Sequence, residues 1–450
     1  MGILQFGTGR ALLRGRPATR YYVDASLGND ANDGMTPDNA WETIAKVNAA
    51  TLNPGESVLF KRGETWAEML TPPSPGATGK HIIFDAYGSG ANPIIDGSAL
   101  NHSLYIQNNT VHHLTFRNIA FAGATGANRE TCRLYTHSIT VTDCEIYGSV
   151  AYIGIAAWSN DGSDTHDIIL RRLTVHDNAT QGIYIGVTTA TNGPISCVVE
   201  SCVCYSNGTN ATSDHGIYVV GGVEVLNNTC YSNMAAGIKT NNAPSGGDYA
   251  SYYPSVHHNY CYSNEYGIIV NCPYGIIVNN LMVENRYNMS PDAGHNGGIY
   301  HNTLVNATDY GIVFNLDTLT DASIKNNIVI QDSLVAGTNE PMRAFGLEID
   351  PMALNNTWDN NIYYRDGVAG TDIIVATTPR TFAEWQGLPG APDANGILDH
   401  PDFVTDYTDL HLLVGSPCRG EGAAGTGVTE DYDGVTRGSP PDIGAYEYVP

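Results

Sequence analysis

The amino-acid sequence predicts an all-β fold, a right-handed parallel β-helix in which short strands coil into stacked rungs. Three observations predict this solenoid. The tetrapeptide Cys-Tyr-Ser-Asn occurs at 204–207, 230–233 and 261–264, and each copy is followed by a Gly-Ile pair. Asparagine recurs every 21–34 residues between Asn228 and Asn361. Apolar and polar residues alternate over short segments, which is the period of a β-strand.

The composition supports strands and excludes some partners. The chain has 450 residues, with 21 Lys and Arg against 46 Asp and Glu and a net charge of −25. This charge excludes a nucleic-acid binder that uses a basic surface, and it repels anionic glycans unless a cation intervenes. The 49 Gly and 27 Tyr suit tight turns and short strands. We find no apolar run of membrane-spanning length and no signal peptide, so we expect no membrane insertion.

The repeats predict how the coil is filled. An asparagine at one turn position in every rung lets each side-chain amide bond the next. The isoleucines of the Gly-Ile pairs should point inward and stack on one another. These are Ile183, Ile217, Ile238, Ile268 and Ile312. The nine cysteines favour buried free thiols, with a Cys132–Cys144 disulfide as the alternative.

The pattern divides the chain into four segments. We predict a basic N-terminal arm at 1–20, an N-terminal cap at 21–100, the β-helix at 101–365 and a turn-rich C-terminal capping segment at 366–450. The β-helix segment has room for about ten rungs, a rod of about 50 Å at the usual strand spacing.

A cap helix is expected at residues 38–50, over the N-terminal mouth of the coil. Asp38 or Asn39 would be its N-cap. Its inward residues would be Trp41, Ile44, Ala45 and Val47.

Three segments resemble the pectate-lyase-like right-handed parallel β-helix proteins. The opening Tyr-Tyr-Val-Asp at 21–24, with Ala-Trp-Glu-Thr-Ile at 40–44, is similar to the N-terminal cap of that group. The Asn and Gly-Ile rungs are similar to its coil, and Pro-Asp-Ile-Gly-Ala-Tyr-Glu at 441–447 to its closing segment. The group includes lyases, hydrolases, epimerases and phage tailspike-like proteins, so the resemblance implies a fold more than a reaction.

One outward file of residues carries candidate chemistry. The residue two after each Gly of the repeat should face outward, which gives Ala156, Tyr184, Tyr218, Lys239, Ile269 and Val313. We predict Lys239, Tyr218, His215 and Asp214 as catalytic residues. Tyr184, Asn241 and Trp158 are predicted to bind substrate, since aromatic faces and amides suit sugars.

This cluster suits β-elimination on a uronate-containing glycan. Lys239 would remove the proton α to the carboxylate, and Tyr218 or His215 would protonate the leaving oxygen. Gly-Ile-Lys239 resembles the Gly-hydrophobic-Lys strand of calcium-dependent pectate lyases, which carry several aspartates one rung below. Here Asp214 stands alone at that level.

Hydrolysis is the second chemistry, and it needs two carboxylates about 5–10 Å apart. The candidates are Asp161, Asp164 and Asp167 in one segment, with Asp177 and Asp214 on neighbouring rungs. A solvated loop explains the first three equally well.

No cofactor is required by either reaction, but two acidic clusters could hold Ca²⁺. One contains Asp24, Asp30 and Asp33, and the other contains Asp431, Asp433, Asp442 and Glu447. Turn-forming side chains are the alternative explanation for both. A metal site at His112-His113, His257-His258 or His301 is not favoured.

The predicted function is binding and degradation of a polysaccharide. The setting we favour is a phage tailspike or receptor-binding depolymerase that acts on a host surface glycan, in the virion or outside the cell. Residues 1–20 would dock to other virion proteins, and the chain would form a homo-oligomer such as a trimer. A secreted bacterial polysaccharide lyase and a non-catalytic structural spike are the alternatives.

Overall fold

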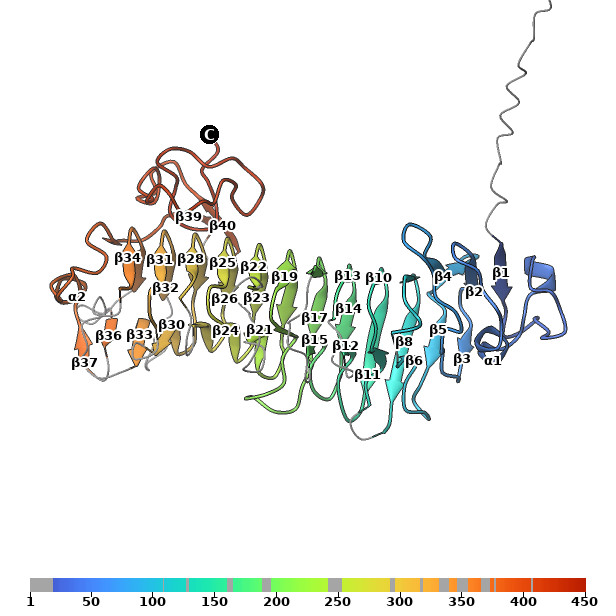
Figure 1. The fold of residues 1–450 in the computed structure, drawn as a ribbon. Helices are drawn as coiled ribbons and strands as arrows, with labels where there is room; N and C mark the ends of the chain where they lie inside the picture. The colour runs from blue at the N-terminus through green and yellow to red at the C-terminus, as the bar shows by residue number, and fades with distance from the viewer. Residues whose placement is uncertain are drawn as a thin grey trace, which may run out of the picture.

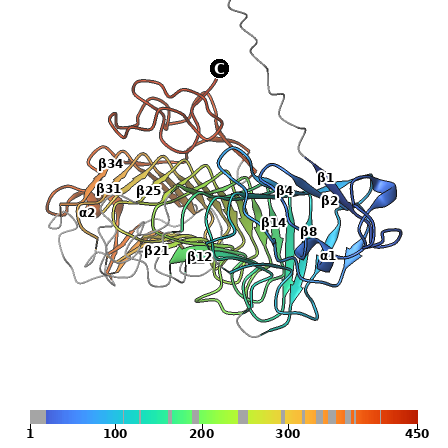
Figure 2. The same ribbon diagram turned by 45° about the vertical axis from the view of Figure 1, so that its right-hand side comes forward.

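The protein is a rod of stacked coils with a lobe on one side (Figures 1 and 2). The structure is a computed structural model. It describes residues 19–107, 109–126, 129–159, 165–187, 196–241, 253–291, 296–315, 319–331, 340–345, 355–365, 373–375, 378–405 and 408–450. The predicted docking arm at 1–20 lies outside the described residues up to residue 18. Within the described part of the chain, no helix has the length and apolar character needed to cross a membrane.

Three long sheets run the length of the rod, and in each the neighbouring rungs pair in parallel along the coil. Sheet A contains β1 (Arg20–Val23), β2 (Ser57–Lys61), β4 (Ile82–Tyr87), β7 (Leu114–Arg117), β10 (Ile139–Thr142), β13 (Ile168–Arg171), β16 (Cys197–Glu200), β19 (Val223–Leu226), β22 (Ser255–His257), β25 (Ile276–Val278), β28 (Gly298–Tyr300), β31 (Ser323–Lys325) and β34 (Thr357–Asp359). Sheet B contains β3 (Thr65–Trp66), β5 (Ile94–Asp96), β8 (Ala120–Ala124), β11 (Glu145–Ser149), β14 (Thr174–His176), β17 (Val203–Tyr205), β20 (Thr229–Tyr231), β23 (Tyr260–Tyr262), β26 (Leu281–Val283), β29 (Thr303–Val305), β32 (Ile328–Gln331), β35 (Ile362–Arg365) and β38 (Ile397–Leu398). Sheet C contains β6 (Leu104–Ile106), β9 (Cys132–Leu134), β12 (Ile155–Ser159), β15 (Ile183–Val187), β18 (Ile217–Val220), β21 (Ala236–Asn241), β24 (Tyr266–Asn271), β27 (Tyr287–Pro291), β30 (Tyr310–Asn315), β33 (Glu340–Phe345), β36 (Ile373–Val375) and the antiparallel edge strand β37 (Thr378–Arg380).

This topology is a parallel β-helix, because the chain visits the three sheets in turn and advances one rung per circuit. Parallel crossovers of this kind are right-handed. Sheet A contributes the ten strands from β7 to β34 between residues 101 and 365, as many rungs as predicted. The sheets also begin before residue 101, since β2 and β4 belong to sheet A. Residues 21–100 therefore hold coil strands as well as cap.

The interior is filled by like residues stacked along the rod. The five isoleucines predicted to point inward are all buried, and Ile183, Ile217 and Ile238 pair in register across β15, β18 and β21. Met289 takes the inward position on the rung between Ile268 and Ile312. The Gly-Ile pattern did not predict this rung, because β27 has no Gly-Ile pair. One continuous hydrophobic core results.

Two asparagine ladders stabilise the corners of the coil. In the predicted ladder each Nδ2 donates to the Oδ1 of the next asparagine at 2.9–3.0 Å. Its members are Asn228, Asn259, Asn280, Asn302, Asn327 and Asn361. A second ladder, with distances of 2.9–3.1 Å, was not predicted as such, although it contains the last residue of every Cys-Tyr-Ser-Asn copy. Its members are Asn178, Asn207, Asn233, Asn264, Asn285 and Asn288.

The residue before each asparagine of the first ladder makes the corner. These residues have φ between 52° and 61°, the left-handed region, which turns the chain sharply from sheet A into sheet B. They are Asn227, His258, Asn279, His301, Asn326 and Asn360. The buried amide that follows satisfies backbone groups that such a turn leaves unpaired.

The helix predicted at 38–50 is wrong in extent. The segment contains a 3₁₀ turn, η1 (Pro37–Asn39), and a short helix, α1 (Ile44–Asn48), whose N-cap is Thr43. Trp41 lies between them because its backbone bridges to Val23 and its ring stacks on Tyr21 at 4.7 Å. Ile44 and Val47 are buried as predicted, but Ala45 is exposed.

The C-terminal segment does two things. The helix α2 (Phe382–Gln386) places Phe382 and Trp385 in the main core and so closes the last rungs. Residues 399–450, with β39 (Phe403–Thr405) and β40 (Asp409–Leu412), instead turn back along the rod and pack on the outer face of sheet B, around Val305 and Ile330. They form the lobe of Figure 2. The segment predicted as capping thus also contains a lobe on sheet B, because an apolar stripe on that sheet offers the lobe a second core.

All nine cysteines are buried and free. The alternative of a Cys132–Cys144 disulfide is therefore wrong. Cys204, Cys230 and Cys261 pair in register as a file of small side chains inside the coil, as the repeat predicts.

Candidate functional site

The outer face of sheet C carries the predicted file of side chains. Ala156 pairs with Tyr184, Tyr184 with Tyr218, and Tyr218 with Lys239. Ile269 and then Ser290 continue the file, so the predicted step from Ile269 straight to Val313 omitted one rung. At the other end the file extends through Arg133 to Tyr105.

Tyr218 is the centre of the predicted catalytic cluster. Lys239 Nζ lies 5.7 Å from the centroid of its ring, and the ring of His215 meets it edge to face at 5.5 Å. Asn241 Nδ2 donates a hydrogen bond of 2.9 Å to Tyr218 Oη. Because this oxygen acts as the acceptor, its own proton remains available for donation to another group.

His215 is held neutral. Its Nδ1 accepts a hydrogen bond of 3.1 Å from the Ala236 N–H, so its proton lies on Nε2. Burial, and then the charge of Lys239, lower the pKa of His215 to about 3. The expectation that His215 protonates a leaving oxygen is therefore wrong, since a neutral imidazole would have to become an anion. It can still donate a hydrogen bond.

Asp214 does not face this cluster as a free carboxylate. Its Oδ2 accepts hydrogen bonds from the N–H groups of Thr209 and Asn210 at 2.9 and 2.8 Å, and its Oδ1 accepts one from Ser213 Oγ at 2.9 Å. The side chain is buried. Asp214 therefore stabilises the 209–213 turn, which corrects its predicted catalytic role.

The predicted substrate-binding aromatics lie together. The ring of Tyr184 meets those of Tyr218 and Trp158 edge to face, each at 5.3 Å. Burial raises the pKa of Tyr184, so its hydroxyl stays protonated. Gly186 makes room for this ring, since a Cβ there would lie 2.2 Å from Tyr184 Oη. The sequence offered no signal for this role of Gly186.

A charged cluster at the other end of the file was missed by the sequence analysis. Glu130 is fully buried, and its Oε2 accepts a hydrogen bond of 2.6 Å from Arg133 Nε. Arg133 also lies 4.6 Å from the Tyr135 centroid, and Tyr135 contacts Trp158 at 4.9 Å. Glu130 Oε1 has no hydrogen-bond partner among the described residues. The outward alternation of Arg133 and Tyr135 was a usable signal, but this rung lacks the Gly-Ile pair.

The carboxylates proposed for hydrolysis are not brought together. Asp161 and Asp164 lie outside the described residues. Asp167 lies immediately before β13 of sheet A and forms an ion pair with His166. Asp177 lies immediately after β14 of sheet B and forms an ion pair with His176. Both are exposed and lie away from sheet C.

The predicted calcium ligands have other partners. Asp24 accepts hydrogen bonds from Lys61 and from the N–H groups of Ser26 and Leu27, and Asp30 accepts them from Thr43. Asp33 accepts one from the N–H of Met35.

The second acidic cluster also serves the fold. Asp431, Asp442 and Glu447 accept hydrogen bonds from backbone N–H groups of the lobe. Asp433 pairs with His411. Across the residues that the structure describes, no group of three or more histidine, cysteine, aspartate or glutamate side chains is arranged to hold a metal ion. The histidine pairs, which were not favoured as ligands, hydrogen-bond to one another instead.

Comparison with known proteins gives remote similarities. No protein-family model matches the chain. The lacto-N-biosidase of Bifidobacterium longum subsp. longum is 22% identical over 190 residues, which are 35% of this chain and 12% of that protein. The match thus spans about one eighth of the bifidobacterial protein.

Solved structures show the same architecture. The GH136 lacto-N-biosidase from Eubacterium ramulus is 18% identical, with 85% of this chain and 67% of that chain covered and a TM-score of 0.53. XylC in complex with xylose is 11% identical, with 96% and 98% covered and a TM-score of 0.63. The catalytic unit of a GH87 α-1,3-glucanase from Streptomyces thermodiastaticus is 13% identical, with 86% and 68% covered and a TM-score of 0.52. These likenesses confirm the predicted fold, a right-handed parallel β-helix.

Proposed function

We propose that the chain binds and cleaves a glycan on the outer face of sheet C. The observation that carries this proposal is a continuous series of aromatic ring contacts on this face. It runs from Tyr135 through Trp158 and Tyr184 to Tyr218. Aromatic rings pack against the apolar faces of sugars, and the polar groups at the Tyr218 end supply proton donors and acceptors. The names of the remote relatives, which are glycan-cleaving enzymes, support the same class of substrate.

The chemistry that the described geometry supports best is β-elimination. Lys239, in its neutral amine form, removes the proton on the carbon next to a uronate carboxylate, and the electrons of that C–H bond form a C=C bond as the C–O bond to the leaving sugar breaks. Tyr218 donates its proton to the leaving oxygen, with Asn241 Nδ2 bound to Tyr218 Oη to stabilise the phenolate that remains. Proton exchange with solvent then restores Lys239 and Tyr218. A cation bound with the substrate would offset the negative charge of the chain.

Hydrolysis is the second candidate, and the similarity to a lacto-N-biosidase and an α-1,3-glucanase favours it. Of the described carboxylates beside the file, Glu130 is bound to Arg133 and Asp214 to the 209–213 turn. A hydrolytic pair would therefore need at least one carboxylate from another segment.

The setting we favour remains a virion-borne tailspike or depolymerase that acts on a host surface glycan. It rests on the basic composition of residues 1–20. A secreted bacterial enzyme is the alternative. Deletion of residues 1–18 should abolish incorporation into particles while glycan cleavage is kept; unchanged incorporation would contradict the virion setting.

The test of the proposed function separates the two reactions. Wild-type protein, Lys239→Gln and Tyr218→Phe are incubated with pectate, alginate, xylan and α-1,3-glucan. Elimination gives the ultraviolet absorbance of an unsaturated product, and each substitution should lower this rate by about 10²–10⁴-fold, the usual contribution of a general acid or base. Tyr300→Phe, which removes a hydroxyl on sheet A, is the matched control and should keep the wild-type rate.

Other outcomes have defined meanings. New reducing ends without that absorbance would replace elimination by hydrolysis. Full activity in both sheet C variants would show that the active site does not lie on sheet C. If the protein neither cleaves nor binds any of these glycans, the proposal is overturned.

A further inference from the structure

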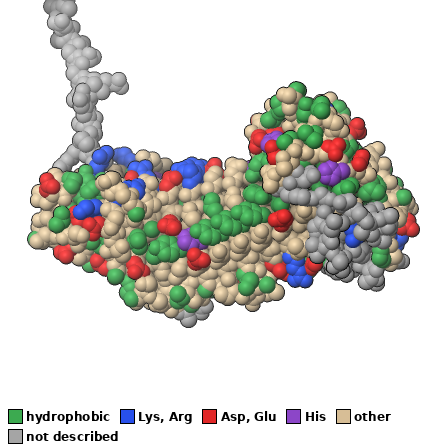
Figure 3. Space-filling view, turned by 180° about the vertical axis from the view of Figure 1, so that it is seen from behind, with side chains coloured by type: hydrophobic (Ala, Val, Ile, Leu, Met, Phe, Trp, Pro, Cys, Tyr) green, Lys and Arg blue, Asp and Glu red, His purple; other side chains and the backbone are tan. Residues whose placement is uncertain are grey.

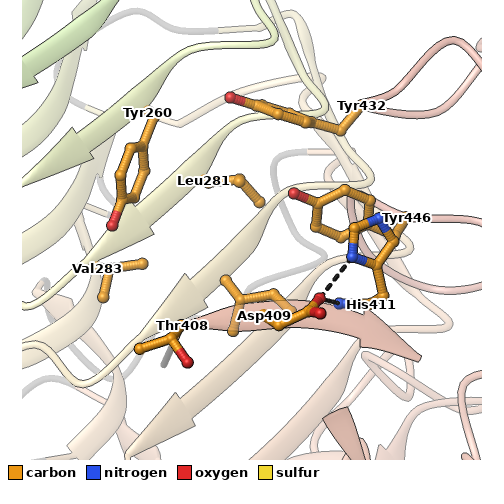
Figure 4. A pocket seen from close by; sticks show the side chains of 9 residues that line it. Tyr260, Leu281, Val283, Thr408, Asp409, His411, Tyr432 and Tyr446 are labelled. Atoms are coloured by element: carbon orange, nitrogen blue, oxygen red, sulfur yellow. Dashed lines mark hydrogen bonds and ion pairs between the residues drawn. The ribbon is translucent and has the colours of Figure 1, made fainter. Parts of the chain in front are cut away.

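The lobe formed by residues 399–450 forms an open pocket of about 390 Å³ against the outer face of sheet B (Figure 4). Strands β23 and β26 of the rod supply one wall, and β40 with two tyrosines of the lobe supplies the other. This volume lies within the usual range of small-ligand sites, about 300–1,000 Å³. The pocket is distinct from the proposed active face, which lies on sheet C.

Three tyrosines line the pocket. Tyr260 projects from the rod, while Tyr432 and Tyr446 come from the lobe, and Figure 4 shows their rings around a common space. Tyr432 and Tyr446 meet edge to face at 5.4 Å. Leu281 and Val283 form an apolar floor. Aromatic walls over an apolar floor suit the faces of a sugar ring.

The polar side of the pocket is fixed by His411. Its Nε2 lies 2.9 Å from Asp433 Oδ2 and its Nδ1 lies 2.5 Å from Asp409 Oδ1, and the imidazole packs at a tilt against the ring of Tyr446, with the centroids 4.0 Å apart. Burial lowers the pKa of His411, but the bonds to the two carboxylates outweigh it and raise the pKa. Asp409, which lines the pocket, is thus held in place, with lone pairs left for sugar hydroxyls. The negative charges of Asp409 and Asp433 disfavour an acidic ligand.

A row of aromatic rings on sheet B leads to this pocket. Parallel rings stack one per rung at 4.8–5.2 Å, with interplanar angles of 3–7°. They are Tyr147, His176, Tyr205, Tyr231 and Tyr262. Tyr262 contacts Tyr260, the first ring of the pocket, at 4.9 Å. Figure 3 shows a band of hydrophobic side chains that runs along the rod up to the lobe.

We propose that the lobe pocket and this row form a second, non-catalytic binding site for a neutral glycan chain. The end of the chain, or one of its units, sits between the tyrosines of the pocket. The following units lie along sheet B, where they contact the outer edges and the polar atoms of the rings, because the faces of successive rings pack on one another. The site binds without cleaving because both carboxylates are engaged by His411. The inference rests on the proposed function only in that both sites bind glycans, since the lobe pocket takes a neutral chain and sheet C a uronate-containing one.

The test measures binding apart from cleavage. Affinity electrophoresis through gels that contain xylan, mannan or α-1,3-glucan is run in the Tyr218→Phe background. Thr408→Trp places a large ring at the exposed rim of the pocket, and Tyr432→Ala removes one wall. We expect at least one polysaccharide to retard the background protein, and each added substitution to weaken that affinity at least tenfold.

Tyr300→Ala, on a half-buried tyrosine of sheet A, is the matched control and should keep the affinity. Thr408→Trp changes an exposed residue, so its melting temperature should equal that of the background protein. A loss of affinity at an unchanged melting temperature then results from blocking of the pocket and not from unfolding. Equal retardation of the Thr408→Trp variant and its background, or no retardation by any of the three polysaccharides, would overturn the proposal. Cleavage of short oligosaccharides by Thr408→Trp with Tyr218 intact should stay at the wild-type rate, which keeps this test independent of the one on sheet C.

Discussion

The inside of the coil and the outer face of sheet C differ in how far their side chains repeat from rung to rung. Inside, the same residue returns at the same position: Asn228, Asn259 and Asn280 bond one another, and Ile217 pairs with Ile238. On the outer face the side chain changes at almost every rung, with Tyr184 and Tyr218 as the one repeated pair in the file from Tyr105 to Ser290. Repetition gives the chain its fold, and the departures from repetition give one face its chemistry.

The two regions also differ in what holds their side chains. Each ladder asparagine makes several buried hydrogen bonds, so no member can be replaced without leaving others unpaired. Tyr184 and Tyr218 are held by edge-to-face ring contacts, which tolerate change. Substitutions inside should therefore cost stability, and substitutions on sheet C should cost function.

The largest expected effect is that of Asn259→Ala. Asn259 Nδ2 donates to Val225 O, His257 O and Asn280 Oδ1, and its Oδ1 accepts from Asn228. Leaving several of these buried groups unpaired should lower the free energy of unfolding by at least about 3 kcal/mol, measured by denaturant titration. Asn53→Ala, at an exposed position, should change it by less than about 0.5 kcal/mol. Equal losses in the two variants would refute the importance of the ladder.

Gly186→Ala tests the outer face. A Cβ at this position would displace the ring of Tyr184, which can move outward. We expect the affinity for a cleaved glycan to fall severalfold, about 1 kcal/mol, with the melting temperature nearly unchanged. A large loss of stability with normal affinity would show that Tyr184 belongs to the scaffold instead.

A smaller effect is expected on acidification. Burial, and then the neighbouring His166, His112 and His113, lower the pKa of His137 to about 4, whereas the unfolded chain takes up that proton near pH 6.5. Asp167 opposes this shift. The unfolded state therefore binds more protons, and the stability that neutral His137 contributes is complete above pH 6.5 and decreases as the pH falls toward 4.

The measurement is the melting temperature at pH 7 and pH 5 for the wild type and for His137→Phe. The phenyl ring keeps the stack of 4.4 Å on His166 and removes the titration, so the variant should lose less stability between the two pH values. Identical pH dependence in both proteins would exclude His137 as a source of acid sensitivity.

The smallest effect is expected from reducing agents. All nine cysteines are free and buried, and burial raises the pKa of Cys132 and Cys204 far above the usual thiol range. Melting temperatures with and without dithiothreitol should therefore agree. A decrease on reduction would reveal a disulfide and contradict the free thiols.

Most of the fold could be predicted because the asparagine and Gly-Ile repeats are visible in the amino-acid sequence. Asn228 to Asn361 defined the ladder, and the Gly-Ile pairs defined the inward file. The rung that contains Met289 was not predicted, because methionine replaces the repeated isoleucine there and still packs in the same inward column. The lobe on sheet B escaped because its contacts join residues more than a hundred positions apart, such as Thr303 and Ala445.

The candidate site was predictable in place but not in detail. Strand alternation placed Tyr184, Tyr218 and Lys239 on one face, since side chains two apart share a side. The protonation of His215 and the role of Asp214 depend on hydrogen bonds to Ala236 and Thr209, which no spacing rule reveals. Glu130 was missed because a fully buried carboxylate is recognised only from its surroundings.

The first ladder has a direction, because every Nδ2 donates to the asparagine of the next rung toward the C-terminus. Its amide dipoles therefore add head to tail, as those of an α-helix do, and each polarises the next. The positive end meets a carboxylate, since Asn361 Nδ2 donates to Asp393 Oδ1 at 2.7 Å. The ladder is thus electrically polar along the rod axis, with its negative end at Asn228, near the middle of the rod, where Oδ1 accepts a hydrogen bond from the Cys202 N–H, and its positive end at Asp393 beside the last rungs.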